Sequence, residues 1–333
     1  MRRRQFLASL AAASVLPPAR AGAQQKVKVH RLAVVAPVDP VTALSETGSS
    51  PPYRAFFERL RQLGFADGQN LEVMRFSGEG HSERFDELVK EVVNLKPDAI
   101  FVNSTRLLFS FKQATTTIPI VSAMADPVRV GLVASISRPG GNITGVAIDQ
   151  GIDLFEKRLE LLKQAAPRTS KLGLLISRTW WLRTDKVGQE APKPSIEVMS
   201  PFEASYWREE DNRPAFERMV REGVDGIIVT EQNENWVYGR SIVALAKEFK
   251  LPAIYPASMF VEVGGLMSFG VVPDDLFRDC ARIIAEIFNG ANPANIPISQ
   301  PTKYELGINL KTAKELGIEI PPSLLVQAHK IVE

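Results

Sequence analysis

The sequence predicts an α/β protein of two lobes, each built on a parallel β-sheet with helices packed against it. Three observations predict this fold class. Short apolar runs with strand character recur along the chain, amphipathic segments separate them, and the alternation occurs as two successive series. Strands that alternate with helices form parallel sheets through right-handed crossovers. The length of 333 residues, 45% of them hydrophobic, suits two cores better than one.

The first series lies before residue 149. Its strands are expected at Arg31–Ala36, Leu71–Phe76, Ala99–Asn103, Ile118–Ser122 and Ile143–Ile148. Its helices are expected at Tyr53–Leu63 and Ser82–Leu95, where apolar residues recur at helical spacing. Gly64 follows the first of these helices, at a position where a left-handed residue commonly ends a helix.

The second series follows the same plan. Its strands are expected at Lys171–Ser177, Ile196–Met199, Gly226–Thr230, Ala253–Tyr255 and Leu266–Phe269, and its helices at Leu154–Ala165, Pro214–Glu222 and Tyr238–Phe249. Gly223 and Gly290 also stand where helices are expected to end. The only cysteine, Cys280, lies in a helix-like pattern, so we expect a buried thiol and no intramolecular disulfide.

The first 23 residues have the three parts of a secretory signal peptide. Arg2–Arg4 form a charged start, Ala8–Leu16 a short apolar run, and Ala21–Ala23 a small-residue exit. Arg3–Leu7 resembles a twin-arginine signal, but Arg2 stands where Ser or Thr is usual, so general secretory export stays open. A disordered basic tail is the other interpretation. We expect cleavage near Ala23 and a periplasmic mature protein that begins at Gln24.

The charge of the chain depends on this segment. The full chain carries 40 basic and 38 acidic residues; loss of residues 1–23 removes four arginines and no acid, which leaves a formal charge of −2. A near-neutral protein lacks the excess of basic residues that is typical of a nucleic-acid-binding surface. No later segment has the roughly 18 consecutive apolar residues of a membrane helix, and no cysteine at the cleavage point accepts a lipid. We therefore expect no nucleic-acid partner and no membrane anchor.

Candidate site residues follow from a rule for open α/β sheets, whose ligands bind at the carboxyl ends of strands. Ser104 and Thr105 follow the third strand, where hydroxyl groups can cap a helix, donate to a ligand carboxylate, or do both. Asp126 follows the fourth strand and could pair with an amine, although Asp before Pro is also an ordinary turn residue.

The loops of the second series add polar and aromatic candidates. These are Arg178, Trp180, Trp181, Gln232, Asn233 and Tyr255. Adjacent residues of a helix point about 100° apart, so Trp180 and Trp181 cannot both face the core, and one of them could form an aromatic wall. Flat apolar walls with a few polar groups are typical of a small-molecule pocket.

Ordered sequence blocks extend over nearly the whole chain after Arg31. They are Gly64–Asn70, Ile118–Val121, Asp126–Val128, Gly131–Val133, Ser137–Gly145, Leu251–Tyr255, Glu262–Ser268, Pro301–Lys314, Leu316–Gly317 and Ile320–Leu325. Together they resemble the substrate-binding proteins of ABC transporters in the tryptophan/tyrosine-type family. Many relatives have an Asn-Pro-rich loop where this chain has Ser177–Trp181, so the resemblance transfers the fold but not an aromatic amino acid as the ligand.

The resemblance implies a type I periplasmic-binding fold with two Rossmann-like lobes joined by a hinge. Residues 24–148 are expected to form lobe 1, residues 149–272 lobe 2, and residues 273–333 the C-terminal helices and hinge crossing segments, part of which returns to lobe 1. A ligand would bind in the cleft between the lobes. The implied partner is an ABC transporter permease in the inner membrane.

Three function classes remain for comparison. The first is a binding protein that captures a small solute, either an amino acid or an aromatic or carboxylate compound, by hinge closure. The second is a sensor that presents such a solute to a membrane receptor. The third is an enzyme, which is disfavoured because His30, His81 and His329 pair with no nucleophile motif, so we expect no catalytic residues.

The sequence also predicts no cofactor and no metal. The glycine-rich stretch Ser137–Gly145 lacks both G-x-G-x-x-G and P-loop spacing, and no His/Cys/Asp cluster has the spacing of a metal site. As a hypothesis for the solute, Ser104 and Thr105 would hold a carboxylate and Trp180 or Trp181 would stack on an apolar part. Arg178 pairing with a second acidic group would favour aromatic acids or dicarboxylates.

Overall fold

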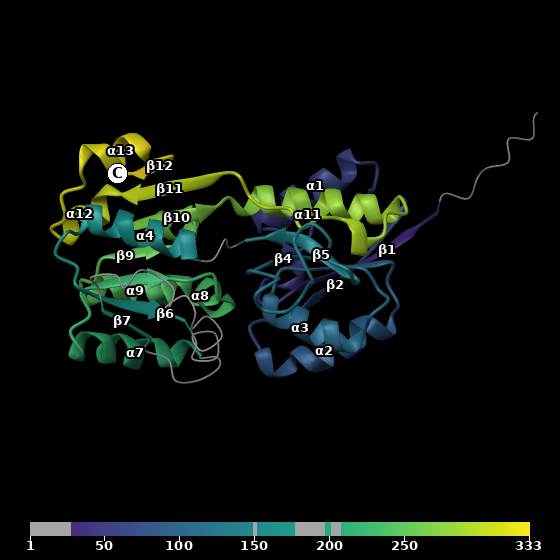
Figure 1. The fold of residues 1–333 in the computed structure, drawn as a ribbon, viewed down its shortest axis with the longest axis horizontal. Coiled ribbons are helices and arrows are strands. Elements are labelled where there is room, and N and C mark those ends of the chain that lie inside the picture. The colour runs from purple at the N-terminus through teal and green to yellow at the C-terminus, as the bar shows by residue number, and fades with distance from the viewer. Residues whose placement is uncertain (1–27, 149–151, 177–196, 201–207) are drawn as a thin grey trace, which may run out of the picture.

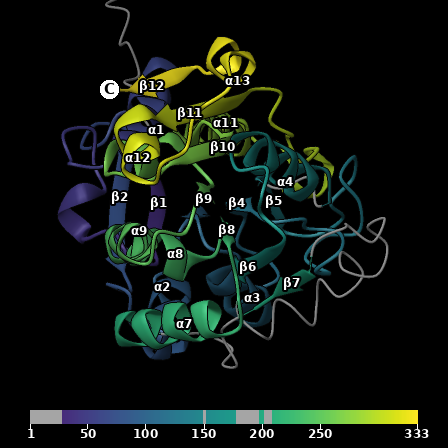
Figure 2. The same cartoon turned by 90° about the vertical axis from the view of Figure 1, so that its left-hand side faces the viewer.

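The computed structural model describes residues 28–148, 152–176, 197–200 and 208–333. This part of the chain forms two α/β lobes that lie side by side (Figure 1). Each lobe has its own sheet, five-stranded in lobe 1 and seven-stranded in lobe 2 as far as the structure describes them. The end-on view places lobe 2 in front of lobe 1 (Figure 2). The predicted fold class, a two-lobed α/β protein, is confirmed.

Lobe 1 is built on a wholly parallel sheet with the strand order β2-β1-β3-β4-β5. Its strands are β1 (His30–Ala36), β2 (Leu71–Ser77), β3 (Ala99–Val102), β4 (Ile120–Met124) and β5 (Ile143–Ala147). Its helices are α1 (Pro51–Gln62), α2 (Phe85–Asn94), α3 (Thr105–Ala114) and α11 (Pro273–Phe288). Helices α1 and α11 pack on one face of the sheet, whereas α2 and α3 cover the other.

The core of lobe 1 depends on aromatic side chains. Phe56 of α1 stacks on Phe101 of β3 with ring centroids 4.3 Å apart, and Phe277 of α11 meets Phe101 edge to face at 5.2 Å. Cys280, on α11, is fully buried, as the sequence predicts. The late helix α11 is therefore part of the first core, although more than 120 residues of chain separate it from β5.

Lobe 2 contains the remaining elements. Its strands are β6 (Lys171–Leu175), β7 (Glu197–Met199), β8 (Gly226–Val229), β9 (Ala253–Tyr255), β10 (Met267–Val271), β11 (Tyr304–Asn309) and β12 (Lys330–Val332). Its helices are α4 (Ile152–Ala165), α7 (Glu209–Arg221), α8 (Asn233–Val237), α9 (Gly239–Glu248), α10 (Ser258–Glu262), α12 (Leu310–Glu315) and α13 (Pro322–Gln327). The strand order is β12-β11-β10-β9-β8-β6-β7.

One pairing departs from the predicted parallel sheets. Strand β11 is antiparallel to β10, while the other pairs of this sheet are parallel in the described part. The direction follows from connectivity, because β10 runs toward lobe 1 and β11 returns from lobe 1. The C-terminal residues, expected to supply helices and crossing segments, thus also supply two strands to lobe 2.

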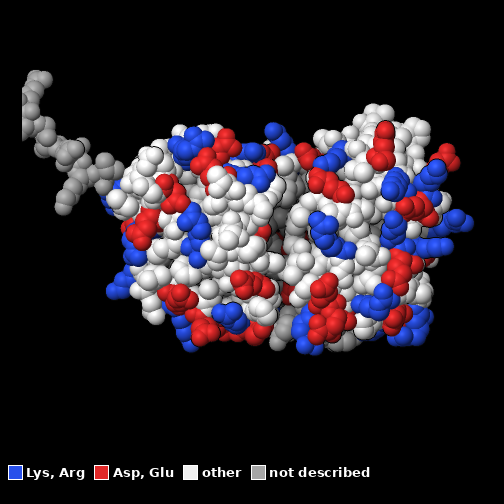
Figure 3. Space-filling model, turned by 180° about the vertical axis from the view of Figure 1, so that it is seen from behind, with Lys and Arg blue, Asp and Glu red and all other residues white. Residues whose placement is uncertain are grey.

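The crossings between the lobes fix which sheet edges face each other. Strand β5 ends at Ala147 and the chain enters lobe 2 at α4, whereas β10 ends at Val271 and the chain enters lobe 1 at α11. The return segment pairs with β5 through Ser299, whose N–H donates to the Gly145 carbonyl at 2.9 Å. In each lobe the carboxyl ends of the parallel strands therefore face the opposite lobe. The space-filling view shows a groove between the lobes (Figure 3).

The predicted elements overlap the observed ones with small shifts at their ends. Gly64, Gly223 and Gly290 have φ angles of 91°, 80° and 97°, so the predicted left-handed helix ends are confirmed. Strand β4 begins at Ile120 rather than Ile118, since Pro119 has no N–H to donate. Among the described residues, no helix is long and apolar enough to cross a membrane.

Candidate functional site

Ser104 and Thr105 lie at the start of α3, at the edge of lobe 1 that faces lobe 2. Ser104 is the N-cap, and its buried Oγ accepts a hydrogen bond from the Leu107 N–H at 3.2 Å. The Thr105 Oγ1 accepts from the Ala125 N–H at 3.1 Å, which joins the start of α3 to the end of β4. A hydroxyl group can both accept and donate hydrogen bonds. Their contact with a ligand carboxylate therefore stays a prediction.

Asp126 follows β4, but its carboxylate is engaged within its own loop. Its Oδ1 accepts from the Arg129 N–H and its Oδ2 from the Arg129 Nε, each at 3.1 Å. Both oxygens thus bind the same neighbour, and the charge of the carboxylate is balanced locally. The sequence allowed two roles for Asp126, as a turn residue or as the partner of an amine. These bonds show it as a turn residue.

The predicted lobe 2 residues differ in what the structure says of them. Arg178, Trp180 and Trp181 lie outside the described residues, as does the side chain of Asn233. Gln232 is the N-cap of α8, and its carbonyl accepts from the Asn235 N–H at 3.0 Å.

Tyr255 is a core residue of lobe 2 in this structure. Its side chain is 1% exposed, its ring stacks on Phe260 with centroids 5.3 Å apart, and burial raises the pKa of its hydroxyl. A side chain covered to this extent contacts a ligand only if neighbouring side chains move. The structure therefore does not bring Tyr255 to the surface of the groove with the other candidates.

Lobe 1 also contributes polar side chains that the sequence analysis did not select. Asp39 lies in the loop after β1, and loss of water around its carboxylate raises its pKa. Nearby, the buried Tyr53 hydroxyl donates to Asn103 Oδ1 at 3.2 Å; burial, and secondarily the Asp39 carboxylate, holds the Tyr53 pKa well above its usual range. The rule that selected Ser104 also applies to Asp39 and Asn103, because each follows the carboxyl end of a strand.

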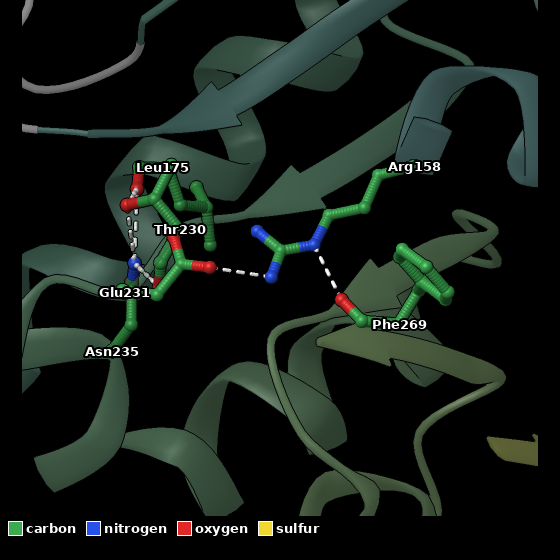
Figure 4. A network of polar contacts seen from close by, with 6 residues as sticks. All are labelled: Arg158, Leu175, Thr230, Glu231, Asn235 and Phe269. Atoms are coloured by element: carbon green, nitrogen blue, oxygen red, sulfur yellow. Dashed lines mark hydrogen bonds and ion pairs between the residues drawn. The ribbon is translucent and has the colours of Figure 1, made fainter. Parts of the chain in front are cut away.

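In lobe 2, a network of polar contacts extends from the carboxyl ends of β6 and β8 to the middle of β10 (Figure 4). Arg158 of α4 is 2% exposed; its Nε donates to the Phe269 carbonyl at 2.7 Å and its Nη2 forms an ion pair with Glu231 Oε1. The Asn235 Nδ2 donates to the carbonyl oxygens of Leu175 and Thr230, at 2.9 and 3.0 Å. Arg158 gave no signal in the sequence, because a helical arginine is usually exposed.

The two lobes also meet near α8. A Cβ atom on Gly80, in the loop after β2, would lie 3.8 Å from a methyl group of Val237. Burial removes water from the carboxylate of Glu234, also on α8, and so raises its pKa. The positive charge of Arg106, on α3 of lobe 1, partly offsets this increase. Charged groups of opposite lobes therefore influence each other across the groove. No cluster that could hold a metal ion occurs among the described residues.

These features together define a class of protein. Two α/β lobes joined by crossing segments, with polar side chains on two facing sheet edges, form the architecture of a type I periplasmic-binding protein. A family model described as ABC transporter substrate binding protein matches residues 41–332, and the chain belongs to this family. Its relatives are binding proteins and not enzymes.

Individual relatives agree with this classification. The tyrosine-binding protein of Clostridioides difficile (strain R20291) is 27% identical over 271 residues, which are 80% of this chain and 76% of the relative. An ABC domain from Streptococcus pneumoniae, solved in complex with L-Trp, is 25% identical with a TM-score of 0.80, covering 92% of this chain and all of that one. A conserved domain protein from Vibrio cholerae has the same fold, with 24% identity, a TM-score of 0.81, and coverage of 91% of this chain and all of that one.

Proposed function

We propose that this protein is the solute-binding component of an ABC importer and that its solute is an aromatic amino acid such as tryptophan or tyrosine. The observation that carries the proposal is the pair of facing sheet edges with polar side chains. It is supported by a Trp-bound structure that superimposes over most of this chain and by a tyrosine-binding relative. Both relatives bind aromatic amino acids by their descriptions, and this favours an aromatic solute over a sugar.

The proposed mechanism is hinge closure. The open state exposes both edges, and a solute that contacts both lobes stabilises the closed state by its higher affinity for it. Ser104 and Thr105 would donate to the carboxylate of the solute, while Trp180 or Trp181 would supply an aromatic surface. The closed, loaded protein would deliver the solute to a permease in the inner membrane.

The proposed location is the periplasm. The charged start, short apolar run and small-residue exit of residues 1–23 support export and cleavage before Gln24. Either the twin-arginine or the general secretory route serves this proposal.

Thermal unfolding of residues 24–333 tests the proposal, after denaturation and refolding to remove any co-purified solute. The panel holds L-Trp, L-Tyr, aromatic acids, dicarboxylates, nucleosides and sugars. A ligand at 100 times its dissociation constant stabilises the native state by about 2.7 kcal/mol, which raises the midpoint by roughly 5–10 °C. We expect this increase with aromatic amino acids. An increase with sugars or nucleosides alone, or with nothing in the panel, would contradict the proposal.

A further inference from the structure

The ion pair between Arg158 and Glu231 lies at the edge of lobe 2 that faces the groove. Arg158 is almost fully buried, and a guanidinium stays protonated in proteins. A buried cation requires a nearby anion, and Glu231 supplies it through Oε1. Glu231 therefore supplies the negative charge that the buried Arg158 guanidinium requires.

The other oxygen of Glu231 is the unusual feature of this pair. An ionised carboxylate has about four acceptor positions. Among the described residues, the only donor to the Glu231 side chain is Arg158, and that bond uses Oε1. The Glu231 side chain keeps 15% of its surface exposed, so Oε2 remains able to accept from a group outside the protein.

Hydrogen bonds of ordinary length hold the chain before and after Glu231, at Thr230 and Asn235. The Thr230 Oγ1 donates to the Leu175 carbonyl at 2.7 Å, and Asn235 donates to the Leu175 and Thr230 carbonyls. Figure 4 shows these contacts beside the bond from Arg158 to the Phe269 carbonyl. These bonds hold the chain that carries the carboxylate, and such preorganisation reduces the entropy lost on binding.

The other carboxylates at the two edges are less suited to receive a cation. Both oxygens of Asp126 already accept from Arg129. Burial raises the pKa values of Asp39 and Glu234, and neither carboxylate forms an ion pair with another described residue. Glu231 alone among these four pairs with a buried cation and also keeps an oxygen that no described donor uses.

We propose that Glu231 Oε2 receives an ammonium group of the solute and that Arg158 is a positioning residue that holds this carboxylate in place through Oε1. The inference rests on the proposed function and assigns the residue that recognises the amino group of its solute. An α-amino acid satisfies the site, whereas an aromatic acid or a dicarboxylate without an amino group does not.

The first experiment compares two pairs of ligands on the wild-type protein by isothermal titration calorimetry. L-Trp is paired with indole-3-propionate and L-Tyr with 3-(4-hydroxyphenyl)propionate, because each acid lacks only the amino group. One hydrogen bond between two charged groups contributes about 1.5–3 kcal/mol, so we expect the amino acids to bind roughly tenfold to a hundredfold more tightly. Equal affinity for both members of each pair would overturn the inference.

The second experiment locates the discrimination at Glu231. Glu231→Gln should weaken L-Trp or L-Tyr binding by about tenfold to a hundredfold and leave the acids unchanged, so the affinity ratio approaches one. The matched control is Glu160→Gln on α4, where Glu160 forms an exposed ion pair with Lys157 at 3.0 Å. This control should keep the wild-type ratio. A wild-type ratio in folded Glu231→Gln would overturn the inference.

Arg158 is tested by the same ratio, because a purely structural role would not change it. Arg158→Gln should reduce the ratio, and Arg158→Lys, which keeps the charge, should restore part of it. If Glu231→Gln does not fold, the double variant Arg158→Gln with Glu231→Gln removes the unbalanced charge and should show a ratio near one.

The outcomes separate the two proposals. Binding of aromatic amino acids with no preference for the amino group refutes the role of Glu231 and leaves the proposed function standing. Binding of none of the four ligands by folded, solute-free protein refutes the aromatic solute, and the role of Glu231 with it.

Discussion

The stability of lobe 2 should depend on the Arg158–Glu231 pair in a characteristic, non-additive way. Arg158→Met would leave a carboxylate whose side chain is only 15% exposed without its cation, and the Phe269 carbonyl without its donor. Removal of one partner of a buried pair costs about 3–5 kcal/mol. Glu231→Leu leaves the guanidinium unbalanced and should cost a similar amount. Each of these losses is a large fraction of the roughly 5–15 kcal/mol by which a folded domain is stable.

The double variant Arg158→Met with Glu231→Leu should cost less than either single change. It removes both charges, so only the unpaired Phe269 carbonyl remains, at about 1–3 kcal/mol. The assay is urea unfolding of the solute-free protein, followed by circular dichroism, for all four combinations. The exposed pair Lys157–Glu160 on the same helix serves as the control cycle, with an expected coupling of at most about 1 kcal/mol. Additive losses at Arg158 and Glu231 would refute the reasoning.

Three further predictions concern other parts of the fold. Gly145 has a φ of 145°, and a Cβ atom there would overlap the backbone of Ser122, so Gly145→Ala should lower the free energy of unfolding in urea by about 1–3 kcal/mol. The control is Gly141→Ala, which should be nearly neutral because nothing lies within 4 Å of a Cβ atom there. Equal effects of the two variants would contradict this explanation. Burial of Cys280 raises the pKa of its thiol, so iodoacetamide should modify it only on unfolding; rapid labelling of the native protein would argue against the α11 core. Burial lowers the pKa of His30, whose Nδ1 has no partner among the described residues. The unfolded chain therefore binds a proton at this histidine more readily than the folded protein does. The free energy of unfolding should decrease as the pH falls below about 6.5 in the wild type, and the His30→Phe variant should lack this contribution.

Much of the fold follows from local sequence patterns. The inner strands of the first series were predictable because most of their residues are apolar and buried, as in Leu32–Ala36 of β1. Strand β2 lies at the edge of the sheet and is only partly buried after Leu71, and its prediction rests on alternation of apolar and polar residues. The start of helix α3 was indicated by Ser104 and Thr105, and Ser104 is its N-cap, but no bounds were predicted for the helix from the sequence. Strand β11 was missed because its role depends on β10, to which the chain returns only after a helix in the other lobe.

The candidate site was only partly predictable, for a physical reason. The strand-end rule places Ser104 and Asp126 at the correct edge, but it does not say which partner each side chain has already found, such as Arg129 for Asp126. Arg158 stands on a helix, so its contact with Glu231 depends on how α4 packs against the sheet of lobe 2. Nor does the strand-end rule say which way a strand-end side chain points, and that of Tyr255 is buried in the core of lobe 2.

The most direct test of the account is calorimetric titration of L-Trp and L-Tyr into refolded, solute-free protein comprising residues 24–333. The account predicts saturable binding of at least one of them, with one site per chain and a dissociation constant near or below about 1 μM, equivalent to about −8.2 kcal/mol. Correctly folded protein that binds neither amino acid at millimolar concentration would contradict the central claim that the two facing edges form an aromatic amino acid site.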